Sequence, residues 1–269
     1  MILNRTSLSI DEIKKVQLEV LESINIFCRE KKLSYFLAYG SLLGAVRHSG
    51  YIPWDDDIDI YMLRSDYNIF KQYFQDENFK LVDFERDNDY PYSYPKVYDS
   101  STEVFEASSI HYPIGINVDI FILDNLPENI KDAREYIKKF IFIENLIAIK
   151  KLKKSPKRSF LKRIMLSVSR FLLFPISCKF LIKRHFRLSS QYSKLKAKYV
   201  ADLSFPDPKK IYEKKMFENI IDLKFEHLIC LAPKEYDSCL KIEFGDYMKL
   251  PSESERVSHH AFKAYHKYK

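Results

Sequence analysis

The sequence predicts an α/β fold, with a mixed sheet flanked by helices and a mainly helical C-terminal half. Short apolar segments bounded by turn residues recur through about the first 125 residues, which is typical of strands. Longer stretches with apolar residues at helical spacing follow from Lys131 onward. We therefore divide the chain into residues 1–130 and residues 131–269. The second part is expected either to pack onto the first as an extension or to form a domain of its own.

The first predicted element is a helix that ends near Lys32. Ser9 and Glu12 have the spacing of a capping box, in which each side chain binds the other residue's backbone N–H. The residues after them repeat at helical spacing and would line one buried face: Ile13, Val16, Val20, Ile24 and Phe27.

A strand, a glycine turn and a second strand are expected next. Residues 34–39 are aromatic-rich and stop at Gly40 and Ser41, before a short helix through Val46. Residues 57–62 begin with alternating acidic and apolar side chains. In an extended strand Asp57 and Asp59 share one face, while Asp56 points to the other.

The remaining elements follow the same rules. We expect a helix capped by Ser65 and strands at residues 79–84, 94–98 and 116–121, the last of which carries Asp119. Helices are predicted over residues 134–149 and 159–174, with further mainly helical segments up to Lys241.

Composition limits the class of protein. An apolar fraction of 46% in 269 residues supplies a core and argues against intrinsic disorder. No leader peptide is recognisable, because polar residues interrupt the first apolar run, and we expect a cytoplasmic protein. The four cysteines, which show no C-x-x-C pair, are expected to be reduced structural thiols, with zinc at Cys230 or Cys239 a minor alternative.

Positive charge is concentrated in one segment. Residues 145–201 hold 16 of the 44 Lys and Arg residues and none of the 37 Asp and Glu residues. Such a segment suits an anionic partner. The apolar stretch 164–182 has no uncharged run long enough to span a bilayer, so residues 150–187 are expected to lie on an anionic membrane surface. An ordinary core helix with a solvated basic face is the alternative.

Residues 55–59 hold four carboxylates in five positions. A solvated acidic turn is the simplest explanation, but apolar neighbours on both sides argue against it. An EF-hand loop is excluded because Ile60 stands where that loop needs glycine. Mg²⁺ or Mn²⁺ bound jointly with substrate phosphates fits better, with Asp57 and Asp59 on one strand and Asp119 as a third ligand.

Groups suited to a phosphate ester surround these carboxylates. Gly40 permits close approach of backbone, and Ser41 offers a hydroxyl. Arg47 and His48 lead toward the acidic strand, and Lys96 adds a further cation. The aromatic residues Trp54, Tyr90, Tyr92 and Tyr94 are a less favoured candidate box for a quaternary ammonium group.

Residues 39–48, Tyr-Gly-Ser-Leu-Leu-Gly-Ala-Val-Arg-His, and 52–60, Ile-Pro-Trp-Asp-Asp-Asp-Ile-Asp-Ile, resemble the signature of the LicD family. That family includes bacterial phosphocholine transferases and is related to fukutin-type phosphotransferases. Further matching blocks begin at Lys96, Gly115 and Gly245, and the last ends at His260. The resemblance is tight at these blocks and loose over the basic helical region.

The resemblance implies a nucleotidyltransferase-like fold, with a Gly-Ser pair before an Asp-x-Asp metal pair and a third carboxylate on a later strand. It also implies the reaction, in which a CDP-activated alcohol such as CDP-choline gives its phosphoalcohol to a glycan hydroxyl and CMP is released. Asp119 would then be either the base or only a ligand. The C-terminal block makes Arg256, His259 and His260 candidates for substrate contacts.

Three functions therefore compete. The first is phosphoalcohol transfer to a cell-surface glycan, a lipid-linked glycan or a teichoic-acid precursor, by an enzyme peripheral on the inner face of the cell membrane. The second is a nucleotidyltransferase that attaches the nucleotide itself, and the third is a non-enzymatic protein that binds anionic membranes. Nucleic acid is not an expected partner, because the acidic part of the chain would repel it.

Overall fold

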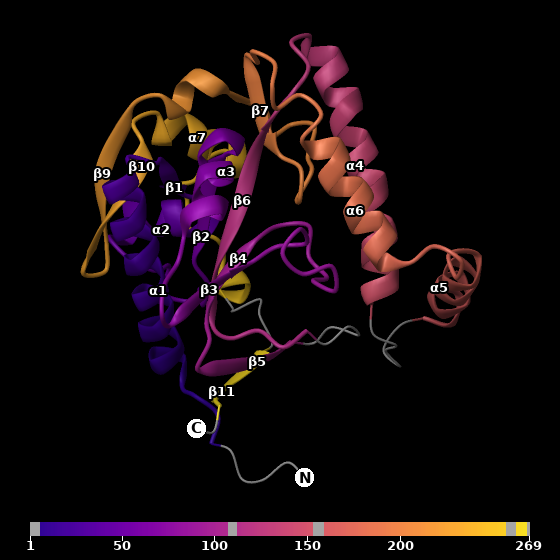
Figure 1. Ribbon diagram of the computed structural model, residues 1–269, viewed down its shortest axis with the longest axis horizontal. Coiled ribbons are helices and arrows are strands. Elements are labelled where there is room, and N and C mark those ends of the chain that lie inside the picture. Colours follow the sequence, from indigo (N-terminus) through magenta and orange to yellow (C-terminus); the bar gives the residue numbers. More distant parts are fainter. Residues whose placement is uncertain (1–5, 107–111, 153–158, 257–261, 268–269) are drawn as a thin grey trace.

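A seven-stranded mixed sheet forms the centre of the computed structural model, which describes residues 6–106, 112–152, 159–256 and 262–267 (Figure 1). Five strands follow the order β1-β2-β6-β4-β3, with β7 joined to β6 and β8 joined to β7. β2 and β6 are parallel and the other pairs are antiparallel. These strands are β1 (Tyr35–Leu37), β2 (Asp59–Leu63), β3 (Phe79–Val82), β4 (Lys96–Asp99), β6 (Asn117–Asn125), β7 (Tyr199–Asp202) and β8 (Tyr212–Glu213).

The predicted N-terminal helix is confirmed as α1 (Ile10–Lys31). Its capping box is present, with the Ser9 hydroxyl accepting from the Glu12 N–H and the Glu12 carboxylate accepting from the Ser9 N–H. Val20, Leu21 and Ile24 are fully buried. Burial of each such side chain contributes about 1.5–3 kcal/mol, so the apolar face holds α1 in the main core.

The second helix begins earlier than predicted. α2 spans Tyr39–His48, so Gly40 and Ser41 lie in its first turn rather than in a turn between strand and helix. Tyr39 has a left-handed backbone with φ of 43°, and Phe121 and Tyr61 pack against its ring. The turn between β1 and α2 is therefore formed at Tyr39, and not at Gly40 as predicted.

Two local predictions around β2 are wrong. The strand begins at Asp59, so Asp57 lies in the irregular segment before it. Ser65 does not cap the next helix, α3 (Arg64–Tyr73), because Leu63 holds the cap position without a side-chain hydrogen bond. The Arg64 guanidinium instead binds Asp124 in a buried two-point ion pair at 2.7 Å, which ties the start of α3 to the end of β6.

The C-terminal half is mainly helical, as predicted, and it also contributes strands that were not expected. β7 and β8 extend the central sheet, and β9 pairs with β10 in a separate hairpin. β11 pairs with β5 in a second small sheet. The elements of this half not yet given are α4 (Ile130–Lys151), α5 (Phe160–Leu172), α6 (Cys178–Ser189), η1 (Lys214–Phe217), β9 (Ile220–Phe225), β10 (Leu228–Pro233), α7 (Tyr236–Phe244), η2 (Glu253–Glu255) and β11 (Phe262–His266). β5 (Thr102–Glu106) belongs to the first half.

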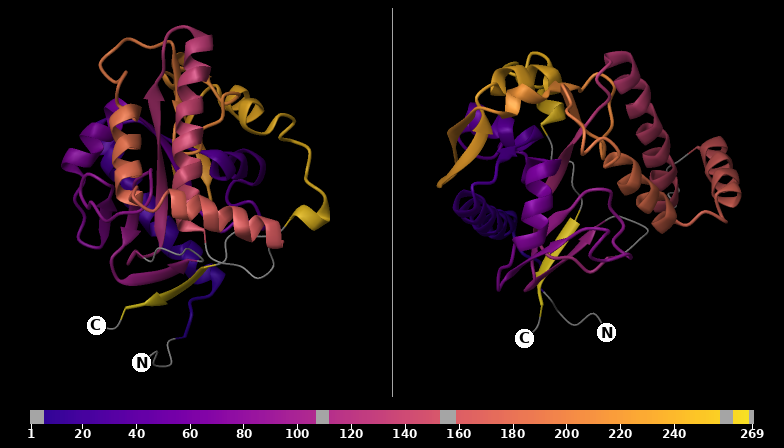
Figure 2. Two further views of the ribbon diagram at one scale, coloured as in Figure 1. Left: turned by 90° about the vertical axis from the view of Figure 1, so that its right-hand side faces the viewer. Right: turned by 45° about the horizontal axis from the view of Figure 1, so that its top comes forward.

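The helices α4 and α6 lie side by side next to the sheet, and α5 lies beyond them (Figures 1 and 2). α4 and α6 pack together in a small core that includes Ile143, Ile147, Leu181 and Ile182, and Phe84 from the segment after β3 joins it. α5 contributes no buried residue to any core. Within the described ranges, no helix has the length and apolar character needed to cross a bilayer.

Candidate active site

Three of the predicted site residues meet where β2, β6 and β4 lie side by side. In the parallel pair Asp59 stands opposite Asp119, and in the antiparallel pair Lys96 stands opposite Asp119. Residues directly opposite each other on neighbouring strands have adjacent side chains. Asp119 therefore has a carboxylate on one side and an ammonium group on the other.

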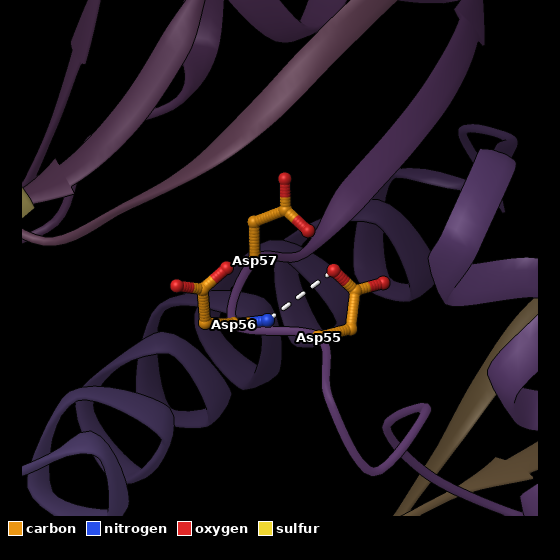
Figure 3. Close-up of side chains that lie close together, drawn as sticks. All are labelled: Asp55, Asp56 and Asp57. Atoms are coloured by element: carbon orange, nitrogen blue, oxygen red, sulfur yellow. Dashed lines mark hydrogen bonds between the residues drawn. The ribbon is translucent and has the colours of Figure 1, made fainter. Parts of the chain in front are cut away.

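Asp55, Asp56 and Asp57 form a carboxylate cluster just before β2. One oxygen of each lies within 4.8 Å of the others, and Figure 3 shows Asp55 and Asp56 on either side of Asp57. The Asp56 N–H donates to Asp55 Oδ1 at 3.3 Å, and the Asp56 carbonyl accepts from the side chain of Gln17. The prediction that Asp56 points away is wrong, because residues 55–58 do not form an extended strand.

Asp59 lies beside these acids and has a strongly raised pKa. Desolvation raises its pKa well above the usual value, and the charges of Asp57 and Asp119 raise it further, while Lys96 opposes them. Its N–H donates to the hydroxyl oxygen of Ser41 at 2.9 Å. Ser41 thus holds the start of β2 against α2, a role that the sequence did not reveal.

Gly40 lies against the same acids. A Cβ atom added there would be 2.5 Å from Asp55 Oδ2, and Cβ atoms in proteins essentially never lie within 3.0 Å of a non-bonded atom. The absence of a side chain therefore lets the Asp55 carboxylate approach the first turn of α2. The group that lies against Gly40 is thus a carboxylate of the protein itself, and the approach of a substrate phosphate to Gly40 stays a prediction.

Lys96 and Asp119 form an ion pair at 2.8 Å, and their side chains are only 5% and 15% exposed. The Asn117 amide also donates to Asp119, at 2.5 Å. The ammonium group lies 5.0 Å from the ring centre of Tyr92 and 5.3 Å from that of Tyr94. These two aromatic faces therefore hold a cation of the protein itself.

A cavity of about 180 Å³ opens between these groups. It is smaller than the roughly 300 Å³ at which pockets for drug-sized ligands begin, so it suits a phosphate-sized group rather than a whole nucleotide. Its lining combines charged and apolar side chains from six parts of the chain: Gln17, Asp57, Tyr94, Lys96, Val104, Ile116, Asn117, Asp119 and Phe262.

A larger cavity of about 540 Å³ lies between α2 and the segment that follows α7, and Arg47 and Trp54 line it. The Arg47 guanidinium donates to the Tyr247 carbonyl at 3.1 Å and to His48 at 3.0 Å. Arg256 lies 5.7 Å from the Trp54 ring. Burial and the nearby charge of Arg256 both lower the pKa of Arg47. In the described ranges neither guanidinium has a carboxylate partner.

The structure thus separates the predicted site residues into two groups. Asp57, Lys96 and Asp119 line the small cavity, with Asp59 opposite Asp119 on the neighbouring strand. Arg47 lines the large cavity, where His48 accepts a hydrogen bond from Arg47 and Arg256 lies over the lining residue Trp54. His259 and His260 lie outside the described residues. The predicted aromatic box is not assembled, because Trp54 and Tyr94 line different cavities and Tyr90 is buried, its hydroxyl donating to the Tyr94 carbonyl.

Several lining residues were missed from the sequence. Gln17 is an interior helix residue, and Phe262 belongs to a strand without a clear alternating pattern. Asn117 offered a signal, since it lies two residues before Asp119 and so shares its face of a strand. The other two have no local signal, because only tertiary packing brings them to the cavity.

The donor set fits a divalent cation. Oxygen ligands alone are what Mg²⁺ and Mn²⁺ prefer, and the clustered Asp55, Asp56 and Asp57 repel each other without a positive charge. Asp59 adds a further carboxylate nearby, and its pKa is raised first by burial and then by the charges of Asp57 and Asp119. All four cysteines are free, and the described residues contain no other group of three or more His, Cys, Asp or Glu with this spacing.

Comparison with known proteins identifies the family of this chain. The family described as LicD/FKTN/FKRP, nucleotidyltransferase domain, matches residues 32–148. A lipopolysaccharide cholinephosphotransferase LicD of Haemophilus influenzae is 30% identical over 268 residues, which cover 96% of this chain and 98% of that protein. Two uncharacterised proteins, of Rickettsia prowazekii and Rickettsia typhi, are 32% and 40% identical over 22% and 25% of this chain and 26% and 20% of their own lengths. The chain belongs to the LicD family.

Proposed function

We propose that the protein transfers phosphocholine, or a similar phosphoalcohol, from a CDP-activated donor to a hydroxyl group of a cell-surface glycan or teichoic-acid precursor, with release of CMP. Membership of the LicD family makes it a phosphotransferase. The observation that carries the proposal is the arrangement of Asp57 and Asp119 beside Lys96 around a phosphate-sized cavity, with Asp59 opposite Asp119 on the neighbouring strand.

The chemistry requires little more than positioning and charge. The acceptor oxygen forms a bond to the phosphorus of the phosphoalcohol, the bond from that phosphorus to the CMP oxygen breaks, and the acceptor proton is lost to a base. When bound to Asp57, Asp59 and Asp119, Mg²⁺ or Mn²⁺ supplies charge neutralisation for the diphosphate. The ion pair with Lys96 favours the ligand role for Asp119, because a carboxylate kept ionised is a weak base.

The larger cavity is the proposed position of the nucleotide. Trp54 offers an aromatic ring, and Arg47 and Arg256 offer two cations that have no carboxylate partner in the described part of the chain. Trp54 directly precedes Asp55 in the chain, so a residue of this cavity is next to the carboxylate cluster in sequence. In this proposal, Gly40, Ser41, His48, His259 and His260 complete the substrate contacts.

The partners follow from this reaction. We infer a CDP-choline or similar donor, a glycan or lipid-linked glycan acceptor, and an anionic membrane surface at the inner face of the cell membrane. The basic residues between 150 and 187 support the last of these, since no acidic residue interrupts them.

A panel assay tests the proposal. The purified protein is incubated with Mg²⁺ or Mn²⁺, an acceptor glycan and each of several CDP-alcohols, and CMP is measured. Release of CMP together with a phosphoalcohol-modified glycan is expected for one donor. Release of pyrophosphate from CTP without CMP would instead identify a nucleotidyltransferase. Absence of turnover with every donor while Mn²⁺ binds would contradict the assignment.

A further inference from the structure

We propose that α5 is an in-plane membrane helix, which inserts its apolar face into the surface of a bilayer containing anionic lipid. Phe160, Leu161, Met165, Phe171 and Leu172 are between 68% and 79% exposed. An exposed apolar surface of this kind marks an interaction site in a soluble protein. This inference names the element that contacts the membrane surface in the proposed function. It rests on the proposed function only for the reason why the protein would bind a membrane.

The exposed large apolar side chains of α5 all lie on one side of the helix. At about 100° per residue, they fall within an arc of about 140°. The exposed members of this apolar face are Phe160, Leu161, Ile164, Met165, Val168, Phe171 and Leu172. A surface helix of a globular protein normally turns such a face toward the core. α5 turns it outward.

Polar contacts on the opposite side fix this orientation. The Arg170 guanidinium donates to the carbonyl oxygens of Ile149 and Leu152 at the C-terminal end of α4. The Lys150 ammonium donates to the Leu173 carbonyl at 2.8 Å. The C-terminal ends of α4 and α5 are therefore joined by these hydrogen bonds. The apolar face of α5 points away from α4 and remains exposed.

The basic residues around α5 indicate that the surface it contacts is an anionic lipid bilayer. Lys162 and Arg163 are exposed on α5 itself, and Lys183 and Arg184 are exposed on the neighbouring α6. An amphipathic helix with basic residues on its polar side binds in the plane of a membrane, with its apolar side among the acyl chains. The basic residues then meet the lipid phosphates. The position of α5 at the edge of the molecule, beyond α4 and α6, leaves this face accessible (Figure 2).

Vesicle sedimentation tests the inference with the full chain. The apolar-face variant carries Leu161→Gln, Met165→Gln and Leu172→Gln, all at exposed positions where the fold loses no buried contact. The matched control carries Ile26→Gln, Ile69→Gln and Ile229→Gln, which remove equally many exposed apolar side chains from α1, α3 and β10. Thermal melting verifies that each variant is folded.

The unmodified protein and the control are expected to sediment with mixed phosphatidylglycerol and phosphatidylcholine vesicles. The apolar-face variant is expected to bind at least about tenfold more weakly. Equal binding by the apolar-face variant, or no binding by the unmodified protein, would overturn the inference. A dimer in sedimentation equilibrium that the apolar-face variant abolishes, without vesicle binding, would make α5 an interface between two copies and overturn it as well.

The two proposals fail separately. With a water-soluble acceptor, CMP release by the apolar-face variant is expected to match that of the unmodified protein, because α5 lines neither cavity. If the unmodified protein binds vesicles but releases no CMP with any donor, only the proposed function is refuted. Intact CMP release with no vesicle binding would refute the membrane helix alone.

Discussion

Lys96 on β4 and Asp119 on β6 occupy opposing positions in the sheet, and their charged groups meet at 2.8 Å in a nearly buried pair. A buried charge that loses its partner is costly, typically by about 3–5 kcal/mol. We therefore expect Lys96→Met to lower the free energy of unfolding by about that amount. Denaturant unfolding of this variant measures the effect. The double variant Lys96→Met/Asp119→Asn should recover most of the loss, and a double variant as unstable as the single one would contradict a pair interaction.

The carboxylates of Asp57 and Asp59 should be needed for turnover but not for folding. Asn replaces either side chain with nearly the same volume and without the charge. CMP release is expected to fall by orders of magnitude, while the melting temperature of the metal-free protein stays or rises because repulsion is relieved. A folded Asp59→Asn protein with near-normal CMP release would refute the metal site. Asp56→Asn, now placed in the cluster, is expected to weaken Mn²⁺ binding as well.

Substitution of Gly40 separates site geometry from stability. In Gly40→Ala the new methyl group meets Asp55 Oδ2, the flexible end of a side chain, which can move aside. Alanine also favours helix over glycine by about 1 kcal/mol, so thermal stability should be kept or slightly raised. Mn²⁺ affinity measured by titration calorimetry should fall, because the Asp55 carboxylate is displaced. Unchanged Mn²⁺ affinity would show that the Asp55 carboxylate takes no part in Mn²⁺ binding.

Glu144 on α4 should give the protein a pH-dependent stability. Desolvation raises its pKa from 4.5 to about 7. Between about pH 4.5 and about pH 7, the folded protein therefore keeps a proton on Glu144 that the unfolded chain has already lost. The free energy of unfolding consequently falls as pH rises from about 4.5 through about 7. Relative to Glu144→Gln, the loss is expected to be on the order of 3 kcal/mol.

Denaturant unfolding of both proteins between pH 4 and pH 8 measures this difference. His185 lies 3.4 Å from Glu144, and burial lowers the pKa of its imidazole to about 4. Its contribution has the opposite sign, with stability rising as pH rises from about 4 to about 6.5, and it is common to both proteins. A difference between the two proteins that is flat with pH would contradict the raised pKa of Glu144.

The basic charges near α5 should make membrane binding sensitive to salt. Each basic residue close to an anionic surface contributes about 1 kcal/mol. The variant Lys162→Gln/Arg163→Gln/Lys183→Gln/Arg184→Gln is expected to bind anionic vesicles more weakly, and its remaining binding should respond less to added salt. Sedimentation across a salt series measures both. Unchanged binding would favour an ordinary helix with a solvated basic face.

The sequence was most informative where short-range rules decide the structure. The capping box of Ser9 and Glu12 and the helical spacing after it predicted α1 to within one residue. The strand with Asp119 was also predicted, although it runs on to Asn125 because β7 pairs with its last residues. Local patterns do not report such distant partners.

The sequence predicted the candidate residues Asp57, Asp59, Asp119 and Lys96, but not how they are arranged. Asp119 lies on the strand next to Asp59, as expected of a third carboxylate from a neighbouring strand. The position of Asp56 was missed, because alternation was assumed to continue into a segment that is not a strand. The pairing of Lys96 with Asp119 was missed too, since it depends on strand order, which one sequence does not display.

Because Phe262 lines the small cavity, this cavity can be completed only after the ribosome has added a residue far along the chain. This side chain lies on β11, whereas Asp57, Lys96 and Asp119 all come from the first half of the chain. At roughly 5–20 residues per second, a ribosome needs on the order of ten seconds to pass from Asp119 to Phe262. A nascent chain that already carries every charged group of the cavity therefore still lacks one of its walls, and the cavity takes its final shape only late in translation.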